Sequence, residues 1–389
     1  MIITLFYTLS ILSLIVGTAA IYLAMIESVP VSWLYYHYFI RKPLNWSILL
    51  LLLSWSSLIY FRESQWPLWT LPPIIIVLFA LILTYKMHQE KAFPSVFFPE
   101  MSDEPYELPI EETMELAVIT YEGIRKCYPL DYVIHHHIVN DRFGTKTVAL
   151  TYCAMCHSII PFDVTDIGPL FVASFKNSNM IVADKATKTF FQQASFQSLI
   201  GKLHPTTLTM IPFQIMTWSD VKDTIKNPLV VHVTKKDFKE FQLPIPGIWK
   251  KLIATEATPG LSSKNRDKTF PTRTRVIGIL EPSFENHIVY LKKTVLNASI
   301  IHNKELGFYL IAHSGTVNGY KDVVNGQHVI ILKENNKLID QLSETHWNMF
   351  GKYLSGSIQA DLDPIAVSDE YWFSWKKFHE DTEVIMDFD

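Results

Sequence analysis

Three long stretches without a charged side chain occupy most of the first 85 residues, and they constrain the fold more than any other feature. They cover residues 2–25, 43–61 and 65–85. Each is close in length to the ~20 residues that an α-helix needs to cross a ~30 Å hydrocarbon core. Tryptophan and tyrosine gather near their ends, where amphipathic rings favour the membrane interface. The sequence therefore predicts a membrane region over residues 1–91, with the lipid bilayer as its partner.

A cleaved signal peptide is the alternative for the first stretch. No Lys or Arg precedes this stretch, and no small-x-small cleavage site follows it. Both features favour a retained helix.

The basic residues outside the three stretches give a small charge asymmetry. Arg41, Lys42, Lys86 and Lys91 would lie on the side of the C-terminal domain, and Arg62 on the opposite side. By the positive-inside rule, four charges against one place this domain in the cytoplasm.

Composition excludes several classes of function. The net charge is -4 with 19% charged residues and no basic cluster, so a nucleic-acid partner is not indicated. Three cysteines cannot form a fully paired disulfide framework, and Cys127 is expected to be a buried apolar residue. The chain has no phosphate-binding glycine loop, nucleophile elbow or His-Glu-x-x-His helix. Kinase, nucleotide-dependent dehydrogenase and standard serine hydrolase functions are therefore excluded.

The region after the membrane helices predicts an α+β domain rich in strands. Residues 92–110 contain Pro and acidic side chains without periodicity, which is typical of a linker. A first half is expected over 111–235, a loop-rich connection over 236–274 and a second half over 275–389. In the first half we expect a hairpin turning at Glu122-Gly123, a short histidine-bearing helix over 131–139 that closes at Asn140-Asp141, and one small antiparallel sheet.

The two halves share spaced residues. Asp184 precedes Phe191 by the same seven residues that separate Asp340 from Trp347. A Gly follows each aromatic residue, by ten residues in the first half and nine in the second. We interpret this as a diverged tandem duplication in which the second half has lost the cysteines. Both aspartates are expected to form turns by accepting hydrogen bonds from backbone N–H groups.

The strongest candidate site is the motif Cys153-Ala154-Met155-Cys156-His157. It follows a β-branched run and lies just downstream of three consecutive histidines, of which His136 is the preferred ligand. Two thiolates and an imidazole would chelate zinc or copper and leave a fourth position open. The candidates for that position are His135, His137, His157, Met155 and Asp163.

Three other interpretations of the cysteine pair stay open. One is a redox-active disulfide, although the pair does not begin a convincing helix as in thioredoxin-like sites. Another is a structural pair within an anchored interaction module. The third, which is less favoured, is covalent attachment of a c-type haem, whose pattern Cys153-x-x-Cys156-His157 fits.

Several ordered motifs in residues 110–386 resemble the prokaryotic family known as domain of unknown function 3179 (DUF3179). They are Tyr128-Pro129-Leu130, His136 with Ile138-Val139-Asn140-Asp141, Thr151-Tyr152-Cys153-x-x-Cys156, Phe162-Asp163, Asn177-Ser178, Asp184 with Thr187, Gln193, Tyr371-Trp372-Phe373-Ser374-Trp375 and Asp381-Thr382. The resemblance implies a cell-membrane protein whose domain lies outside the cytoplasm, against the charge count, and it implies no particular reaction. His135, His137, His157 and Phe191 depart from the residues usual in that family.

The function that we predict from the sequence is metal binding at Cys153, Cys156 and His136 in a membrane-anchored domain. Neither an enzymatic reaction nor a protein partner follows from the sequence.

Overall fold

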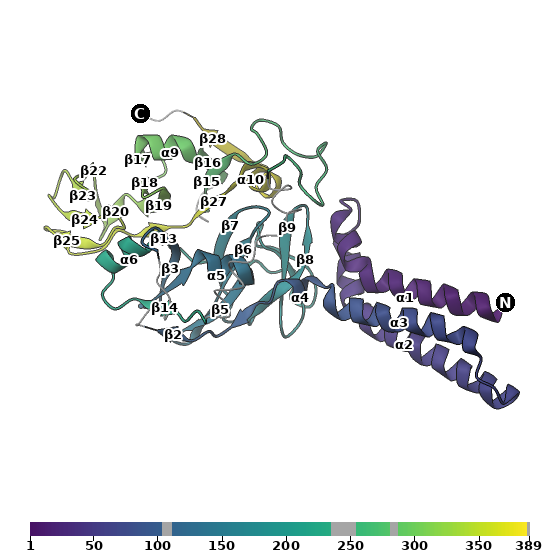
Figure 1. Cartoon of the computed structure of the whole chain (residues 1–389). Coiled ribbons are helices and arrows are strands. Elements are labelled where there is room, and N and C mark those ends of the chain that lie inside the picture. Colours follow the sequence, from purple (N-terminus) through teal and green to yellow (C-terminus); the bar gives the residue numbers. More distant parts are fainter. Residues whose placement is uncertain (103–110, 235–253, 281–286, 387–389) are drawn as a thin grey trace.

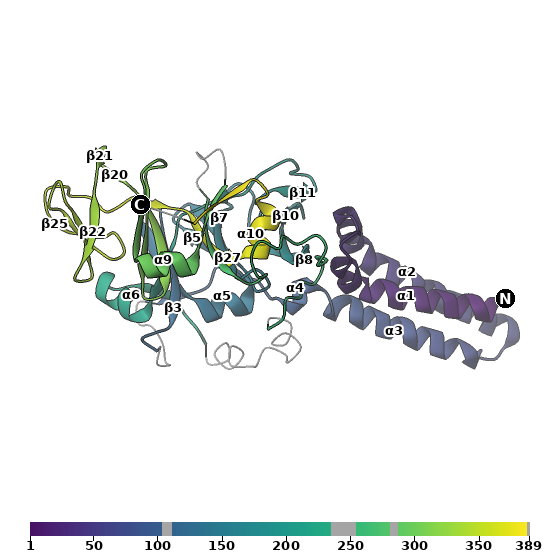
Figure 2. The same cartoon turned by 90° about the horizontal axis from the view of Figure 1, so that it is seen from above.

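The predicted membrane region consists of three apolar helices, each long enough to cross a bilayer. The computed structural model describes residues 1–102, 111–234, 254–280 and 287–386 (Figure 1). The helices are α1 (Ile2–Met25), α2 (Val31–Glu63), and α3 (Leu71–Lys86) with the preceding turn η1 (Leu68–Thr70). They form a bundle that projects from one end of the strand-rich domain (Figures 1 and 2). Because a Cβ on Gly17 would lie 2.7 Å from the Ala80 carbonyl oxygen, glycine permits the close contact of α1 with α3.

Helix α2 begins twelve residues before the expected stretch 43–61, so most of the expected first loop is helical. Its charged residue Arg41 is only 2% exposed, donates to the Tyr38 carbonyl oxygen and lies 4.0 Å from the Glu90 carboxylate. Glu90 belongs to α4 (Gln89–Ala92), which follows α3. A partner on another element, Glu90, therefore helps the helix to continue through a charged position. Pro43 also lies inside α2.

In its described residues, the first half of the domain contains three sheets. The first sheet has the order β13 (Gln214–Thr217), β3 (Glu115–Tyr121), β4 (Ile124–Pro129), β14 (Leu229–Val231) and β2 (Met101–Ser102). The second has the order β1 (Val96–Phe97), β5 (Ile138–Phe143), β6 (Lys146–Cys153), β7 (Ser158–Asp163) and β12 (Thr209–Met210). The third has the order β11 (Ser198–Ile200), β10 (Phe190–Gln192), β9 (Asn179–Asp184) and β8 (Leu170–Lys176).

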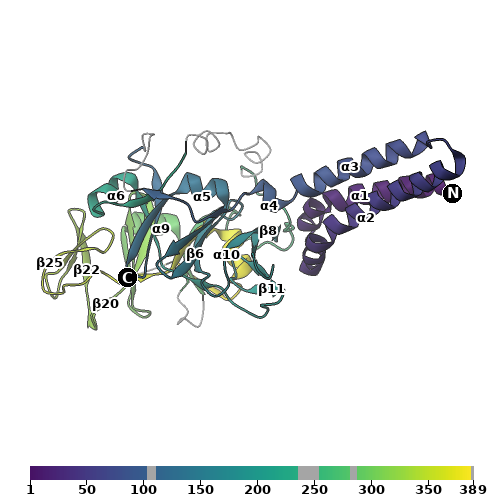
Figure 3. The ribbon, with the colours of Figure 1, turned by 90° about the horizontal axis from the view of Figure 1, so that it is seen from below.

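The part of the second half that the structure describes contains three four-stranded sheets and one two-stranded sheet. The first has the order β27 (Val367–Tyr371), β15 (Arg275–Ile279), β16 (His287–Leu291) and β28 (Thr382–Ile385). The second has the order β17 (Ile300–Asn303), β18 (Phe308–His313), β19 (Thr316–Lys321) and β26 (Pro364–Ile365). The third has the order β22 (Ile331–Glu334), β23 (Lys337–Asp340), β24 (His346–Asn348) and β25 (Tyr353–Ser355). The two-stranded sheet consists of β20 (Val323–Val324) and β21 (Gln327–His328). Strands β22 and β25 lie at the end farthest from the membrane helices (Figures 1 and 3).

Both halves follow the same order of elements. A seven-residue helix follows each first hairpin, α5 (Leu130–His136) in the first half and α9 (Lys292–Ala298) in the second. In each half a later strand, β13 or β27, pairs antiparallel with the first hairpin strand, β3 or β15, and a second seven-residue helix follows it. A last strand, β14 or β28, then pairs parallel with the second hairpin strand, β4 or β16. These second helices are α6 (Trp218–Thr224) and α10 (Trp372–Phe378). The tandem duplication stays a prediction that is consistent with this order.

Several local expectations differ from the structure. The predicted linker 92–110 contributes β1 and β2 to two sheets, while residues 103–110 lie outside the described part. Asn140 and Asp141 lie inside β5 rather than ending a helix, because Asn140 bonds the Val96 and Leu170 carbonyl oxygens. The expected single small sheet is split between two sheets. Of the predicted connection 236–274, residues 254–274 are described and contain neither helix nor strand.

The apolar cores join the two halves and attach the domain to the membrane helices. One core packs Leu116, Cys127 and Trp218 against Tyr309 and Trp347, so Cys127 is buried as expected. Another core, in which the third sheet of the first half packs on the ends of α1 and α2, contains Ala24, Leu34, Phe171, Ile181 and Phe190. The domain is therefore seated directly on its membrane helices.

Candidate functional site

The cysteine pair lies at the hairpin that joins β6 to β7. Cys153 ends β6 and pairs with Ser158, the first residue of β7, and the intervening turn reaches a positive φ of 58° at His157. The two Sγ atoms are 3.2 Å apart and form no disulfide. Cys156 is fully buried and Cys153 is 3% exposed. The turn thus brings both sulfur atoms into contact inside the domain.

Polar groups from two other segments surround the sulfur atoms. The thiol of Cys156 donates to the Ser178 carbonyl oxygen at 3.2 Å and accepts from Asn179 Nδ2 at 3.1 Å. Asn179 Nδ2 also donates to Gln193 Oε1. The amide nitrogen of Gln193 in turn donates to Thr151 Oγ1 at 3.2 Å. The residues of this cluster are almost fully buried. A buried polar network of this kind holds the hairpin in one arrangement.

The two thiols differ in acidity. Burial alone would raise the pKa of Cys153, but its contact with the Cys156 side chain and hydrogen bonds from the backbone of Cys156, Met180 and Met155 stabilise its thiolate and lower that pKa overall. Burial, and then the hydrogen bond and charge of Cys153, raise the pKa of Cys156 well above its ordinary value. Cys153 is therefore the more acidic thiol of the pair and Cys156 the less acidic one.

A buried carboxyl group from the second half completes this environment. Glu370, on β27, is 1% exposed, and burial raises its pKa to about 7. The negative charge of Glu370 contributes to the raised pKa of Cys156. The backbone N–H of the adjacent Tyr371 donates to the Cys156 carbonyl oxygen at 2.9 Å. Ser368 donates to one carboxyl oxygen at 2.8 Å. The site therefore combines a dithiol with a carboxyl group that changes protonation near neutral pH.

The histidines proposed as ligands have other contacts. His136 shares a hydrogen bond with the Pro94 carbonyl oxygen through Nδ1 and packs edge-on against Tyr132. His137 packs against Phe93, with ring centroids 4.2 Å apart and ring planes tilted by 31°, and burial lowers its pKa to about 4. His135 packs edge-on against His136. All three lie on α5 or at its end.

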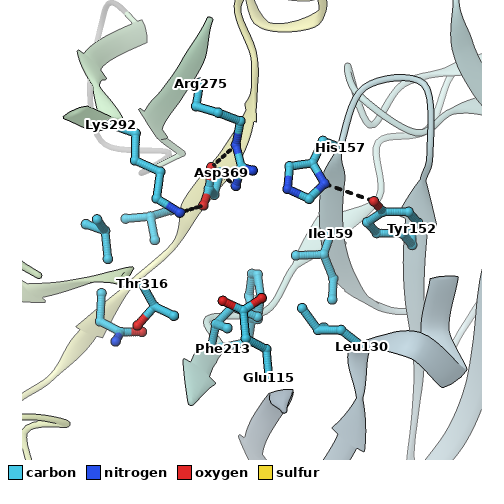
Figure 4. Close-up of a pocket in the computed structure, with 14 residues that line it drawn as sticks. Glu115, Leu130, Tyr152, His157, Ile159, Phe213, Arg275, Lys292, Thr316 and Asp369 are labelled. Carbon is cyan, nitrogen blue, oxygen red and sulfur yellow. Dashed lines mark hydrogen bonds and ion pairs between the residues drawn. The ribbon is translucent and has the colours of Figure 1, made fainter. Parts of the chain in front are cut away.

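The remaining candidates for a fourth ligand form hydrogen bonds with other side chains or pack in an apolar core. Asp163 accepts from Tyr121 Oη at 2.6 Å at the other end of β7, five residues from Ser158. Met155 packs against the apolar core that contains the cysteines. His157 shares a hydrogen bond of 2.9 Å with Tyr152 through Nδ1 (Figure 4). Within residues 1–102, 111–234, 254–280 and 287–386, no three His, Cys, Asp or Glu side chains are grouped so as to hold a metal ion.

Sequence reasoning missed Glu370. The only available signal was an acidic residue in a short strand, just before an aromatic run. Gln193 was noted only as part of a family motif, without a role.

The family assignment follows from a comparison with protein-family models. Residues 90–382 match the model described as protein of unknown function DUF3179. The chain belongs to the DUF3179 family. The DUF3179 match begins within α4, includes the cysteine hairpin and Glu370, and excludes α1 to α3. It confirms the resemblance found in the sequence. No curated protein and no solved structure matched the chain.

Proposed function

We propose that this DUF3179 protein carries a membrane-anchored thiol–disulfide redox centre at Cys153 and Cys156. The observation that carries the proposal is the contact of the two sulfur atoms at 3.2 Å, with opposite shifts in their pKa values. The more acidic thiol is also the more exposed of the two. This division matches a nucleophilic and a resolving cysteine.

The exchange would proceed in two displacements with a small external disulfide as oxidant. The Cys153 thiolate attacks one sulfur of that disulfide, forms a mixed disulfide and releases one thiolate. Cys156 then loses its proton and attacks Cys153 Sγ, which releases the second thiolate and forms the Cys153–Cys156 disulfide. Two cysteine thiols are oxidised and one external disulfide is reduced. A small oxidant is required because Cys153 is only 3% exposed.

Glu370 is the proposed acceptor of the Cys156 proton. A carboxyl group with a pKa of about 7 is partly ionised at neutral pH, so it can accept a proton from a thiol and later return it. Its burial beside Cys156 keeps the transfer away from water.

A redox titration of the full chain in detergent tests the proposal. The protein is equilibrated in glutathione buffers of graded potential, quenched with acid, alkylated after unfolding and weighed by mass spectrometry. We expect one two-electron transition that protects two of the three cysteines from alkylation. Cys127→Ser should keep this transition, whereas Cys156→Ser should abolish it. Three alkylated cysteines at every potential would exclude the redox function.

Metal binding is the second candidate function. The backbone N–H groups that donate to Cys153 also stabilise a thiolate, which is the form that binds zinc or copper. The two sulfur atoms supply only two ligands, and among the described residues no three His, Cys, Asp or Glu side chains are grouped around one position. Elemental analysis of the reduced full chain and of a Cys153→Ser, Cys156→Ser variant tests this candidate. Stoichiometric zinc or copper that disappears in the variant would replace the redox proposal.

The burial of both cysteines does not favour covalent haem attachment, because each sulfur would have to reach a porphyrin vinyl group. A purely structural pair would leave the redox titration without a transition.

We further propose that the domain lies outside the cytoplasm of a prokaryotic cell. The resemblance to exported proteins supports this side, and an oxidising compartment suits a disulfide. Arg41, counted above as a loop charge, is buried in the helix bundle beside Glu90 and carries less weight in the positive-inside count. Protease treatment of sealed spheroplasts should digest the domain, and its protection would place the domain in the cytoplasm.

We also propose that the two halves arose by duplication. Asp184 accepts from the backbone N–H of Thr187 and Thr189, and Asp340 accepts from the N–H of Ser343 at the corresponding turn. Asp184→Ala and Asp340→Ala should therefore destabilise the protein by similar amounts in chemical denaturation. A large effect at only one position would argue against equivalent turns.

A further inference from the structure

A cavity of about 100 Å³ lies between the two halves of the domain (Figure 4). Its walls come from elements on both halves, including the hairpin that carries the cysteines. The lining residues that matter here are Glu115, His157, Arg275, Lys292, Asn318 and Asp369. A site built from both halves exists only when the domain is assembled.

The charges around this cavity are separated. Asp369 accepts hydrogen bonds from Arg275 at 2.8 Å and from Lys292 at 2.7 Å, so this cluster carries one net positive charge. The Glu115 carboxylate lies across the cavity from the cluster (Figure 4). Burial, followed by the charge of Arg275, lowers the pKa of His157 to about 4, so this ring is neutral at pH 7. The lining therefore has no net charge but has a positive and a negative side.

Asn318 adds an unsatisfied hydrogen-bonding group. Its side chain is 3% exposed, and within the described residues neither Oδ1 nor Nδ2 has a hydrogen-bond partner. Buried amides are rarely left without partners, because their desolvation is costly. A molecule in the cavity that both donates and accepts hydrogen bonds would satisfy both atoms.

We propose that this cavity binds a small zwitterionic amino acid. Its carboxylate would face Arg275 and Lys292, its ammonium group would face Glu115, and the Asn318 amide would bond to the polar end groups. A cavity of about 150 Å³ holds benzene, so a volume of about 100 Å³ suits glycine, alanine or serine rather than a large side chain. The proposal is independent of the chemistry of the cysteines.

Isothermal titration calorimetry of the full chain in detergent tests this site. We expect alanine to bind at least tenfold more tightly than acetate or methylamine, which each carry only one of its two charges. Phenylalanine should not bind, because its side chain exceeds the cavity.

Two variants and one control assign the binding to the cavity. Asn318→Leu and Glu115→Gln should each weaken alanine binding tenfold or more. Glu111→Gln removes an exposed carboxylate that does not line the cavity and should leave binding unchanged. If Asn318→Leu does not fold, the exposed Glu115 still provides the test. Cys153→Ser should bind alanine normally, which separates this site from the redox centre.

Three outcomes would overturn the proposal. The first is that glycine, alanine and serine all fail to bind at millimolar concentration. The second is that acetate binds as tightly as alanine, which would indicate a simple anion site. The third is unchanged alanine binding in Glu115→Gln.

Discussion

At the scale of single residues, burial decides how the site responds to pH. Glu370 is ionised in the unfolded chain above its ordinary pKa of 4.5 but keeps its proton in the folded protein up to a pKa of about 7. Between these values the folded state binds more protons than the unfolded state, so the Glu370 contribution to stability falls as pH rises. The loss amounts to ~3 kcal/mol, since one pKa unit corresponds to ~1.4 kcal/mol.

Glu370→Gln should therefore be more stable than the wild type at pH 8 and should differ less from it at pH 5. Thermal denaturation of both proteins at pH 5, 6, 7 and 8 measures this difference. The variant must be compared with the wild type at each pH, because other buried groups titrate in the same range. Burial lowers the pKa of His157 and His137 to about 4, so these two groups increase the stability of both proteins as pH rises from about 4 to 6.5. Glu334→Gln, on an exposed part of β22, is the control. A pH-independent difference between Glu370→Gln and wild type would contradict the raised pKa of this carboxyl group.

At the scale of elements, one glycine fixes how α10 packs on β15. A Cβ atom on Gly278 would lie 1.9 Å from the ring of Trp375, which is fully buried. Gly278→Ala should destabilise the protein by ~3 kcal/mol or more, because neither the strand nor the buried indole has room to move. Urea denaturation measures the change in free energy.

Gly123→Ala is a suitable comparison for this test. A Cβ there meets no atom within 4 Å, and the substitution introduces only the strain of a positive φ of 74°. It should cost ~1 kcal/mol. Equal effects of the two substitutions would show that the predicted clash is relieved.

The sequence predicted those elements whose pattern is local. The β3–β4 hairpin follows from its strand pattern and the turn at Glu122-Gly123, and the cysteine hairpin from a β-branched run that ends at Cys153. The early start of α2 was missed because the partner of Arg41 lies on α4, near residue 90. Glu370 was missed because its proximity to Cys156 joins segments more than 200 residues apart. Local patterns do not encode such contacts.

At the scale of the whole molecule, the domain and its membrane helices share one apolar interface. Polar contacts border it, because Lys176 donates to the Ile26 carbonyl oxygen at 2.6 Å and the Glu27 carboxylate accepts from Ser262 N and Asn265 Nδ2, both at 2.7 Å. The hairpin turn at Ser178 connects this interface to the cysteines, since its carbonyl oxygen accepts from Cys156. The anchor therefore supports the sheet against which the candidate site is built.

Removal of residues 1–87 should expose the apolar side of the third sheet of the first half, including Phe171 and Phe190. Exposed apolar patches promote association, so the truncated protein should self-associate in analytical ultracentrifugation and bind a hydrophobic dye. The same truncation with Phe171→Lys and Phe190→Lys should shift toward the monomer. In the full chain these two substitutions should instead loosen the domain from its helices and speed its release by protease at the segment near residue 93. A monomeric truncated protein that binds no dye would show that the helices are a tether rather than a structural support. In that case the anchor would hold the domain at the membrane without shaping the sheet beneath Cys156.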